Sequence, residues 1–357
     1  MKMKKIPNRQ EHLDFHTSEM IDQVGSKFSA EEFADTLKNA NVEAVTLFTR
    51  CHHGNLYYDS TKYPERIHPH LKVKDMYREQ AKECRKKGIK VYLYTTICWD
   101  IRVAAEHPEW VAIDDYARIS RRETGNIFED PGFHVDLCIN SPYREFCKEQ
   151  IADALENCPV DGVLVDASFV VECCCPRCRK SMLEKHLNPA DPQDRKKHAW
   201  QIYYDFVREM TDYLHEIDSD YDIFFNKGHV GAQDIPVRDC FDYVAVESQP
   251  ANCGYMDFPV SARYLRTWGV PVVGMTGRFL TGWGDNNSYR NQAALEYESF
   301  SALSYGGLCN IGDQLPPSGQ LDKDMYGVIG DVFRQVKEKE PWCEAVSYTH
   351  LRAHETK

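Results

Sequence analysis

The chain has 357 residues, 42% of them hydrophobic and 27% charged, which is a globular composition with enough length for one large domain or two smaller ones. Its formal net charge of −12 disfavours nucleic acids and anionic membranes as partners, because both require a basic surface. No apolar run of roughly 18 residues and no signal peptide core are present, so we expect a cytoplasmic protein whose 14 cysteines are thiols or metal ligands.

Strands and helices are expected to alternate from the N-terminus onward. A short strand at residues 13–16 precedes a helix that Ser29 and Glu32 cap, and this helix runs to about residue 40. Further along, Ser141-Pro142 marks another helix start. The remaining strands are predicted at 42–49, 90–96, 162–166, 222–226, 243–247, 272–276 and 307–312, and the remaining helices at 75–87, about 178–217 with a break at NPADP, 260–268, 292–305 and 324–339.

Eight strands, most of them followed by a helix, indicate parallel strands joined by helical crossovers. The predicted fold is therefore an α/β protein, a (β/α)₈ TIM barrel with long loops after several strands. A doubly wound open sheet is the alternative, but it would usually carry a glycine-rich phosphate turn after its first strand, where this chain reads DFHTSEM. We expect one catalytic domain over residues 1–345.

The last 12 residues form a separate segment. From Val346 they read VSYTHLRAHETK, which resembles the translation of a transposon-based sequencing adapter. This predicts a non-native tail over residues 346–357, with native C-terminal domains missing. A polar, disordered tail is the alternative.

The catalytic residues of a barrel enzyme lie at the carboxyl ends of its strands, and here these ends are rich in chemically active side chains. Carboxylates can divide the work of glycoside hydrolysis, imidazole and amide groups bind hydroxyls, and aromatic rings stack on sugars. A single such residue is more often a cap or an ion-pair partner, so the argument depends on their number at one edge. They are His16, His52, His53, Trp99, Asp166, Asn226, Glu247, Arg278 and Trp283.

A cysteine cluster follows the fourth predicted strand, in the segment ECCCPRCRK. Cys173, Cys175 and Cys178 have the spacing C-x-C-x₂-C, and three such thiolates can occupy three corners of a zinc tetrahedron. Cys138 is the candidate for the fourth ligand. Free thiols in a loop are the alternative, but we favour a closed and therefore structural zinc site.

Several motifs together resemble the α-L-fucosidase-like glycoside hydrolases. They are DFHTSEM, TLFTRCHHGNLYYDSTKYPERIHPHL, LCINSPYREF, DGVLVDAS and CCCPRCRKSM. The likeness is greatest to the group catalogued as hypothetical glycosyl hydrolase 6, which overlaps glycoside hydrolase family 151, and it extends to family 29. In the family 29 motif an Asp follows the His pair, whereas this chain has Gly54.

The resemblance assigns roles to individual residues. Asp166, at the end of the fourth strand, corresponds to the nucleophile. Glu247 is the candidate acid/base, with Glu172 as the reserve. The sugar would be bound by His16, His52, His53 and Tyr57, together with Asn226 and Arg278, and stacked on by Trp99 and Trp283.

The cysteine pattern is similar to that of family 42 β-galactosidases, in which the corresponding residues bind structural zinc. This implies zinc ligation by Cys138, Cys173, Cys175 and Cys178. Those enzymes have an Asn-Glu pair at the end of the fourth strand, whereas this chain has Val165-Asp166, which argues against β-galactosidase chemistry. Both groups usually carry a trimerisation domain after the barrel, so the resemblance implies a homo-oligomer such as a trimer for the full-length protein.

The sequence thus predicts a retaining exo-α-L-fucosidase that acts on oligosaccharides or glycoconjugates and has no organic cofactor. A β-galactosidase-like or other exo-glycosidase of the same barrel type is one alternative. A metal-dependent barrel hydrolase using the His and Asp set, and a non-catalytic carbohydrate-binding barrel, are the others.

Overall fold

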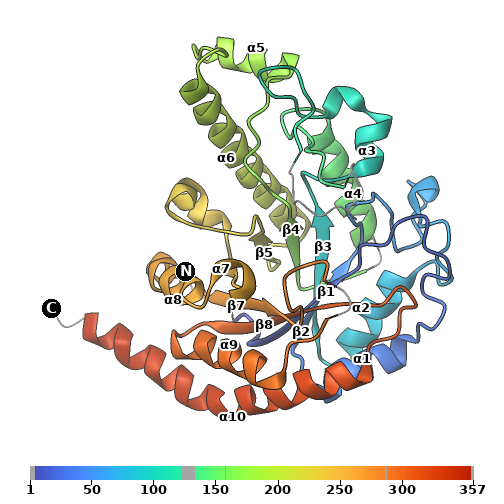
Figure 1. The fold of residues 1–357 in the computed structure, drawn as a ribbon, viewed down its shortest axis with the longest axis vertical. Coiled ribbons are helices and arrows are strands. Elements are labelled where there is room, and N and C mark those ends of the chain that lie inside the picture. Colours follow the sequence, from blue (N-terminus) through green and yellow to red (C-terminus); the bar gives the residue numbers. More distant parts are fainter. Residues whose placement is uncertain (1–4, 122–132, 157, 286–287, 355–357) are drawn as a thin grey trace.

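The computed structural model describes residues 5–121, 133–156, 158–285 and 288–354. Within them, eight parallel strands form a nearly closed barrel surrounded by helices (Figure 1). The predicted (β/α)₈ TIM barrel is therefore confirmed. The strands are β1 (Arg9–Asp14), β2 (Ala44–Phe48), β3 (Lys90–Thr96), β4 (Gly162–Asp166), β5 (Asp222–Phe225), β6 (Val244–Glu247), β7 (Val272–Gly277) and β8 (Leu308–Gln314).

The helices follow the predicted alternation, with extra short helices in the loops. Figure 1 shows α5 and α6 projecting away from the barrel, while α10 runs along its opposite side. The α-helices are α1 (Ala30–Asn39), α2 (Met76–Lys86), α3 (Ile101–Glu106), α4 (Tyr143–Leu155), α5 (Pro176–Glu184), α6 (Pro192–Ile217), α7 (Pro250–Cys253), α8 (Asp257–Leu265), α9 (Gln292–Ser304) and α10 (Lys323–His354). Short 3₁₀ helices lie at Pro64–Arg66, Pro108–Trp110, Ala232–Cys240 and Arg266–Trp268.

Local sequence explains where these helices begin. The Ser29 side chain accepts a hydrogen bond from the Glu32 backbone N–H, as the capping pattern predicted. Asn291 caps α9 in the same way, by accepting from the Ala294 N–H. At α4 the cap lies one residue later than predicted, because Pro142 and not Ser141 precedes the first helical residue.

The predicted position of the first strand was wrong. β1 spans Arg9–Asp14, whereas the sequence predicted residues 13–16. All six residues of RQEHLD are buried, although five of them are polar or charged, and hydropathy does not predict a buried strand from such residues. Arg9 is neutralised by Glu43 at 2.7 Å, which lets the strand lie inside the fold.

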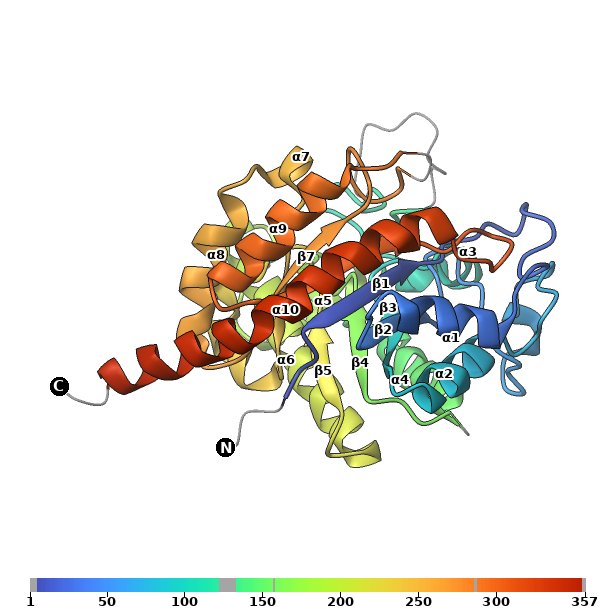
Figure 2. The ribbon, with the colours of Figure 1, turned by 90° about the horizontal axis from the view of Figure 1, so that it is seen from below.

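The last helix is longer than predicted. The sequence predicted residues 324–339, which end before Pro341, a residue that lacks the N–H that an interior helical residue donates. In the structure α10 continues through Pro341 to His354. Figure 2 shows α10 crossing beneath the barrel beside α9 and α1, with its end projecting beyond them.

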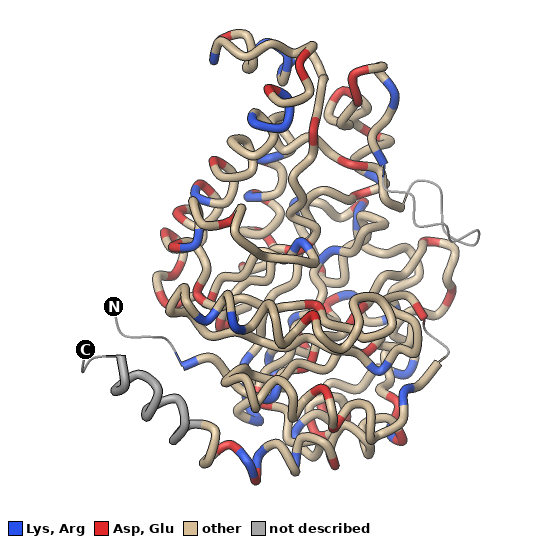
Figure 3. The backbone as a smooth tube through the Cα atoms, turned by 60° about the vertical axis from the view of Figure 1, so that its left-hand side comes forward, with Lys and Arg blue, Asp and Glu red and all other residues tan. Residues whose placement is uncertain are grey.

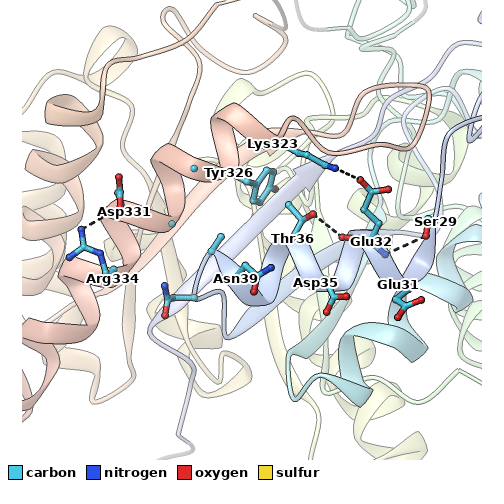
Figure 4. A pocket seen from close by; sticks show the side chains of 14 residues that line it. Ser29, Glu31, Glu32, Asp35, Thr36, Asn39, Lys323, Tyr326, Asp331 and Arg334 are labelled. Atoms are coloured by element: carbon cyan, nitrogen blue, oxygen red, sulfur yellow. Dashed lines mark hydrogen bonds and ion pairs between the residues drawn. The ribbon is translucent and has the colours of Figure 1, made fainter.

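A groove lies between α10 and α1 on the outside of the barrel. Figure 4 shows its polar side chains, among which Lys323 pairs with Glu32 at 2.6 Å and Arg334 pairs with Asp331 at 3.3 Å. Gly330 lets the two helices approach, since a Cβ there would lie 3.1 Å from the Ala40 Cα. The Lys323–Glu32 pair and the close approach at Gly330 therefore join the two helices, whereas the Arg334–Asp331 pair lies within α10.

The barrel has one seam. The hydrogen-bonded strand order is β5-β4-β3-β2-β1-β8-β7-β6, so β5 and β6 form its two ends. The Asp242 N–H donates to the Ile223 carbonyl at 3.1 Å, and the Ile223 N–H donates to the Asp242 carboxylate at 2.9 Å. These two bonds hold the amino-terminal ends of β5 and β6 together.

Charges of both signs are interspersed along the described chain (Figure 3). None of the described helices combines the length and the apolar character needed to cross a membrane.

Candidate active site

Asp166 is the last residue of β4 and lies within a group of polar partners. The Tyr94 hydroxyl of β3 donates to its Oδ2 at 2.6 Å, and the His52 Nε2 lies 3.6 Å from the same oxygen. The Tyr94 hydroxyl and the His52 Nε2 are themselves 3.0 Å apart. Tyr94 and Phe48 stack at 3.6 Å and support this group from β3 and β2.

Asn226 joins Asp166 to Glu247. It follows β5, and its Nδ2 donates to the Asp166 Oδ1 at 2.8 Å and to the Glu247 Oε1 at 2.6 Å. The two carboxylate oxygens therefore lie no farther apart than the sum of these distances. Retaining glycosidases place their two carboxyl groups about 5–5.5 Å apart, and inverting ones about 6.5–9.5 Å apart.

The two carboxyl groups have opposite pKa shifts. Burial raises the pKa of Asp166, but the hydrogen bonds from His52 and Tyr94 and the charge of His52 outweigh it, so the net pKa lies below the usual value. Burial raises the pKa of Glu247, and the charge of Asp166 raises it further against the Asn226 hydrogen bond. Asp166 therefore remains ionised under conditions in which Glu247 holds a proton.

A histidine group flanks Asp166 on the β1 and β2 side. The His16 Nδ1 accepts the His52 backbone N–H at 3.2 Å, and the two rings are 4.1 Å apart. Burial first, and then the nearby His52, hold the pKa of His16 well below its usual value. His16 is thus a neutral imidazole with its hydrogen on Nε2, which faces the Asp14 Oδ1 at 3.7 Å. The His12 Nε2 lies 3.4 Å from the same Asp14 oxygen.

Aromatic rings cover this histidine group. Trp99 lies 5.0 Å from His52 and 4.2 Å from His134. Phe133 contacts the rings of His16, His52 and His53 at 5.6, 5.1 and 5.0 Å. Trp283, after β7, lies 5.3 Å from His12 and so reaches the same strand ends from the other side.

Two predicted residues have other partners in the structure, and a third is exposed. The Tyr57 hydroxyl is buried and bonds Thr17 through both the backbone N–H and the side chain. Arg278 pairs with Asp313 and donates to the Ser288 carbonyl at 2.8 Å. Glu172 is exposed.

The orientation of Arg278 follows from strand alternation. Thr276, two residues earlier on β7, hydrogen-bonds Glu298 of α9, so residues 276 and 278 face the outer helices. Gly277 faces inward, where its Cβ would lie 3.1 Å from the Gln249 amide nitrogen. The sequence placed Arg278 at the correct strand end, and the strand turns its side chain away from Asp166.

Sequence reasoning also missed several residues of the site. Asp14 and His12 alternate with His16 at spacings of two, a strand period that could have placed all three on one face. Tyr94 lies two residues before the end of β3, on the face that carries Asp166 one strand away. Phe133 and His134 lie in a long loop with no periodicity, and no sequence signal would have found them.

Gly54, at the departure from the family 29 motif, has a steric explanation. Its φ of +81° is in the left-handed region that favours glycine. A Cβ there would lie 2.5 Å from Asp100 Oδ1 and 2.7 Å from Arg102 Cβ. No side chain, and hence no Asp, fits at this position.

The four predicted metal ligands come together in the structure. The sulfur atoms of Cys138, Cys173, Cys175 and Cys178 all lie within 4.8 Å of one another and are buried. Among the described residues, this is the one group of three or more His, Cys, Asp or Glu whose ligand atoms converge. Hydrogen bonds among these thiols lower the pKa of Cys173 and Cys175 and raise the pKa of Cys138 and Cys178, so the four groups share their protons.

Comparisons with known proteins show which families and structures this chain resembles. Residues 29–167 match the family model described as "Hypothetical glycosyl hydrolase 6". The structure is similar to α-L-fucosidase isoenzyme 2 from Paenibacillus thiaminolyticus, with 34% identity and a TM-score of 0.88, over 95% of this chain and 50% of that one. The chain therefore spans half the length of that relative. A comparison with curated protein sequences found no match.

More distant structures share the barrel. An α-fucosidase from Thermotoga maritima has a TM-score of 0.53 at 15% identity over 88% of this chain and 58% of its own, and one from Vibrio sp. strain EJY3 has 0.54 at 13% over 90% and 46%. At these identities the likeness concerns the fold alone. The resemblance to α-L-fucosidase-like glycoside hydrolases that the motifs predicted is thus confirmed, by a family model over residues 29–167 and by a structural match along nearly the whole chain.

Proposed function

We propose that this chain is the catalytic barrel of a retaining exo-α-L-fucosidase. The observation that carries the proposal is the Asn226 amide, which holds the carboxylates of Asp166 and Glu247 within the separation that a retaining mechanism uses. The likeness to an α-L-fucosidase over 95% of the chain supports fucose as the sugar.

The geometry suggests how the two carboxyl groups divide the work. Asp166, ionised and oriented by Tyr94 and Asn226, attacks the anomeric carbon and forms a glycosyl ester. Glu247, protonated because burial and Asp166 raise its pKa, gives its proton to the leaving oxygen. It then takes a proton from the water that hydrolyses the ester, so the anomeric configuration is retained.

The remaining residues bind the sugar in this proposal. His16, a neutral imidazole, and His52 meet the hydroxyls near Asp166, while Trp99 and Trp283 stack on the ring or its methyl group. His53 lies beside Phe133 at the edge of this group. Glu172 stays the reserve acid/base, and the exposed loop position gives it less support than Glu247 has.

The test is stereochemical. Hydrolysis of an aryl α-L-fucoside, followed by NMR before mutarotation, is expected to release α-L-fucose first. Release of the β-anomer would contradict the retaining mechanism. Turnover of an aryl β-D-galactoside with no turnover of the fucoside would instead favour the β-galactosidase-like alternative.

Replacing Asn226 by Ala is expected to shift both limbs of the pH profile of kcat/KM to higher pH. Activity requires an ionised Asp166 and a protonated Glu247, and the Asn226 hydrogen bond lowers the pKa of Glu247. Without this bond Glu247 keeps its proton to higher pH, so the alkaline limb moves to higher pH. The carboxylate of Asp166 also loses a hydrogen-bond donor, which raises its pKa and moves the acid limb to higher pH. Because the two carboxyl groups are no longer held in place, kcat should fall roughly 10-fold. A pH-rate series on both proteins measures this, and unshifted limbs would contradict the shared-amide geometry.

We also propose that Cys138, Cys173, Cys175 and Cys178 hold one structural zinc ion. Sulfur atoms at about 2.3 Å from a tetrahedral zinc lie about 3.8 Å apart. The Cys138 sulfur lies 3.9 Å from that of Cys175 and 3.5 Å from that of Cys178, which fits this geometry. Four thiolates leave no open position, so the ion would join the segment before α4 to the loop after β4 without entering the reaction.

Cys175→Ser is expected to abolish metal binding and lower the unfolding midpoint by roughly 10 °C, because the cluster joins two long loops. Elemental analysis should find one zinc per wild-type chain and none in the variant. Cys174→Ser is the matched control, because this adjacent buried cysteine lies outside the four-sulfur group and should keep the metal. Equal metal content in the two variants would contradict the assignment.

The same four cysteines support a reducing, cytoplasmic location, because they converge as thiols and not as disulfides. We also propose that the protein is a homo-oligomer, which light scattering on the purified protein tests.

A further inference from the structure

Gln249 has a buried side-chain amide that no described residue pairs with. The residue is 3% exposed, and neither its Nε2 nor its Oε1 has a hydrogen-bond partner among the described residues. Buried polar groups in folded proteins are nearly always paired, because an unpaired one costs free energy. A buried amide with both groups unpaired therefore requires a reason, and a bound ligand would supply one.

The amide points toward the same side as Glu247. Gln249 follows Glu247 by two residues, and its backbone is extended, with φ −88° and ψ 114°, so the two side chains share a face. Glu247 pairs in register with Met275 of β7, and the Gln249 amide lies over Gly277, two residues farther along that strand. Gln249 thus lies one step beyond Glu247 toward the open end of the barrel.

Two glycines make room on this wall. Gly277 and Gly312 pair in register on β7 and β8. A Cβ on Gly277 would lie 3.1 Å from the Gln249 Nε2 and 2.8 Å from the Phe279 ring, and one on Gly312 would lie 2.2 Å from the Trp283 ring. Any larger residue at either position would displace these side chains.

Trp283 adds a second polar group to the same wall. Its indole Nε1 is buried and has no hydrogen-bond partner in the part of the chain that the structure describes, and its ring lies 5.3 Å from both Phe279 and His12. The wall formed by the ends of β6, β7 and β8 therefore presents an amide and an indole N–H beside Glu247. Histidines and Trp99 form the opposite, β1 to β3 side.

We infer that Gln249 is a substrate-binding residue that hydrogen-bonds two adjacent hydroxyl groups of the sugar, with the Trp283 indole N–H as a further donor. An amide offers one acceptor and one donor in a plane, which matches a hydroxyl that donates next to a hydroxyl that accepts. The inference rests on the proposed function, because it takes the sugar to lie between Asp166 and Glu247. It adds a specificity contact that the strand-end motifs do not include.

The first test separates substrate binding from a packing role. Gln249→Leu keeps the side-chain volume and removes both polar groups. We expect KM for an aryl α-L-fucoside to rise roughly 10- to 100-fold with a smaller change in kcat, and the unfolding midpoint to equal or exceed that of the wild type, because an unpaired amide has left the interior.

Gln150→Leu is the matched control. Gln150 is also fully buried, but its Nε2 donates to the Tyr58 hydroxyl at 3.1 Å and its Oε1 accepts from the Thr95 hydroxyl at 3.3 Å. This variant should have a lower unfolding midpoint and an unchanged KM. The inference is overturned if Gln249→Leu behaves like Gln150→Leu, with lost stability and a KM within twofold of the wild-type value.

Calorimetric titration with L-fucose and its monodeoxy analogues distinguishes this inference from the proposed function. Wild type should lose affinity when either of two adjacent hydroxyls is removed, and Gln249→Leu should be insensitive to the same two removals. If the wild-type protein hydrolyses fucosides but both proteins respond alike to every removal, the role of Gln249 is wrong and the proposed function stands. If the wild-type protein neither binds fucose nor hydrolyses a fucoside, both are overturned.

Discussion

Asp166→Asn is expected to lower the turnover of an aryl α-L-fucoside by roughly 10⁴-fold or more while the fold is kept. The amide cannot form the glycosyl ester, yet it can still accept from Tyr94 and occupy the same space beside Asn226. Steady-state kinetics and a circular dichroism melt on the same preparation measure the two expectations. The smaller variant Asp166→Gly should regain turnover with added azide, which can reach the anomeric carbon and give an inverted glycosyl azide.

The matched control for this carboxylate is Asp153→Asn. Asp153 is also buried and accepts from the hydroxyls of Tyr58 and Ser60 at 2.7 and 2.6 Å, but it lies on α4. Its replacement should lower stability and leave kcat per folded molecule unchanged. Near-wild-type turnover in Asp166→Asn would show that another group is the nucleophile.

Glu247→Ala is expected to lower kcat by roughly 10²- to 10⁴-fold on fucosides whose leaving group needs a proton. With an activated aryl leaving group the first step needs little acid assistance, so the loss in kcat/KM, which reports that step, should be much smaller. The variant should also lose the alkaline limb of its pH profile, because the group whose raised pKa sets that limb is gone. A series of aryl fucosides with leaving groups of different pKa measures the first effect, and a pH-rate profile the second.

Azide gives an independent check of this residue. In Glu247→Ala it can attack the glycosyl ester without base assistance, so it should raise turnover and yield a product of retained configuration. Glu172→Gln, made in parallel, decides between the two candidates. A larger loss in that variant, with Glu247→Ala unaffected, would transfer the acid/base role to the loop after β4.

The sequence predicted the fold well wherever strand residues are apolar. The predicted strands at 90–96 and 162–166 coincide with β3 and β4, because their β-branched and aromatic residues are typical of a buried strand. β1 was misplaced, since Arg9, Glu11 and His12 are buried through tertiary contacts that hydropathy cannot register. The same limit applies to Pro341, where the helix continues through a residue that ordinarily ends one.

The candidate site was only partly predictable. Asp166, Asn226 and Glu247 follow from strand ends alone, and the structure shows them bonded in one row. Arg278 follows the inward-facing Gly277 by one residue, so strand alternation turns its side chain toward the outer helices, where it pairs with Asp313. Tyr94 reads as an ordinary core aromatic, since its hydroxyl partner becomes visible only when β3 and β4 lie side by side.

The seam between β5 and β6 has a consequence for how substrate binding and folding are linked. The carboxyl ends of these strands are joined by the side-chain bond from Asn226 to Glu247, while two bonds between Asp242 and Ile223 join the other ends. A ligand that engages Asp166 and Glu247 at once would connect β4 to β6 across this seam. Binding of the sugar and closure of the seam would then be thermodynamically linked. A variant with a looser seam would bind the sugar more weakly, and a tightly bound inhibitor would stabilise the closed barrel.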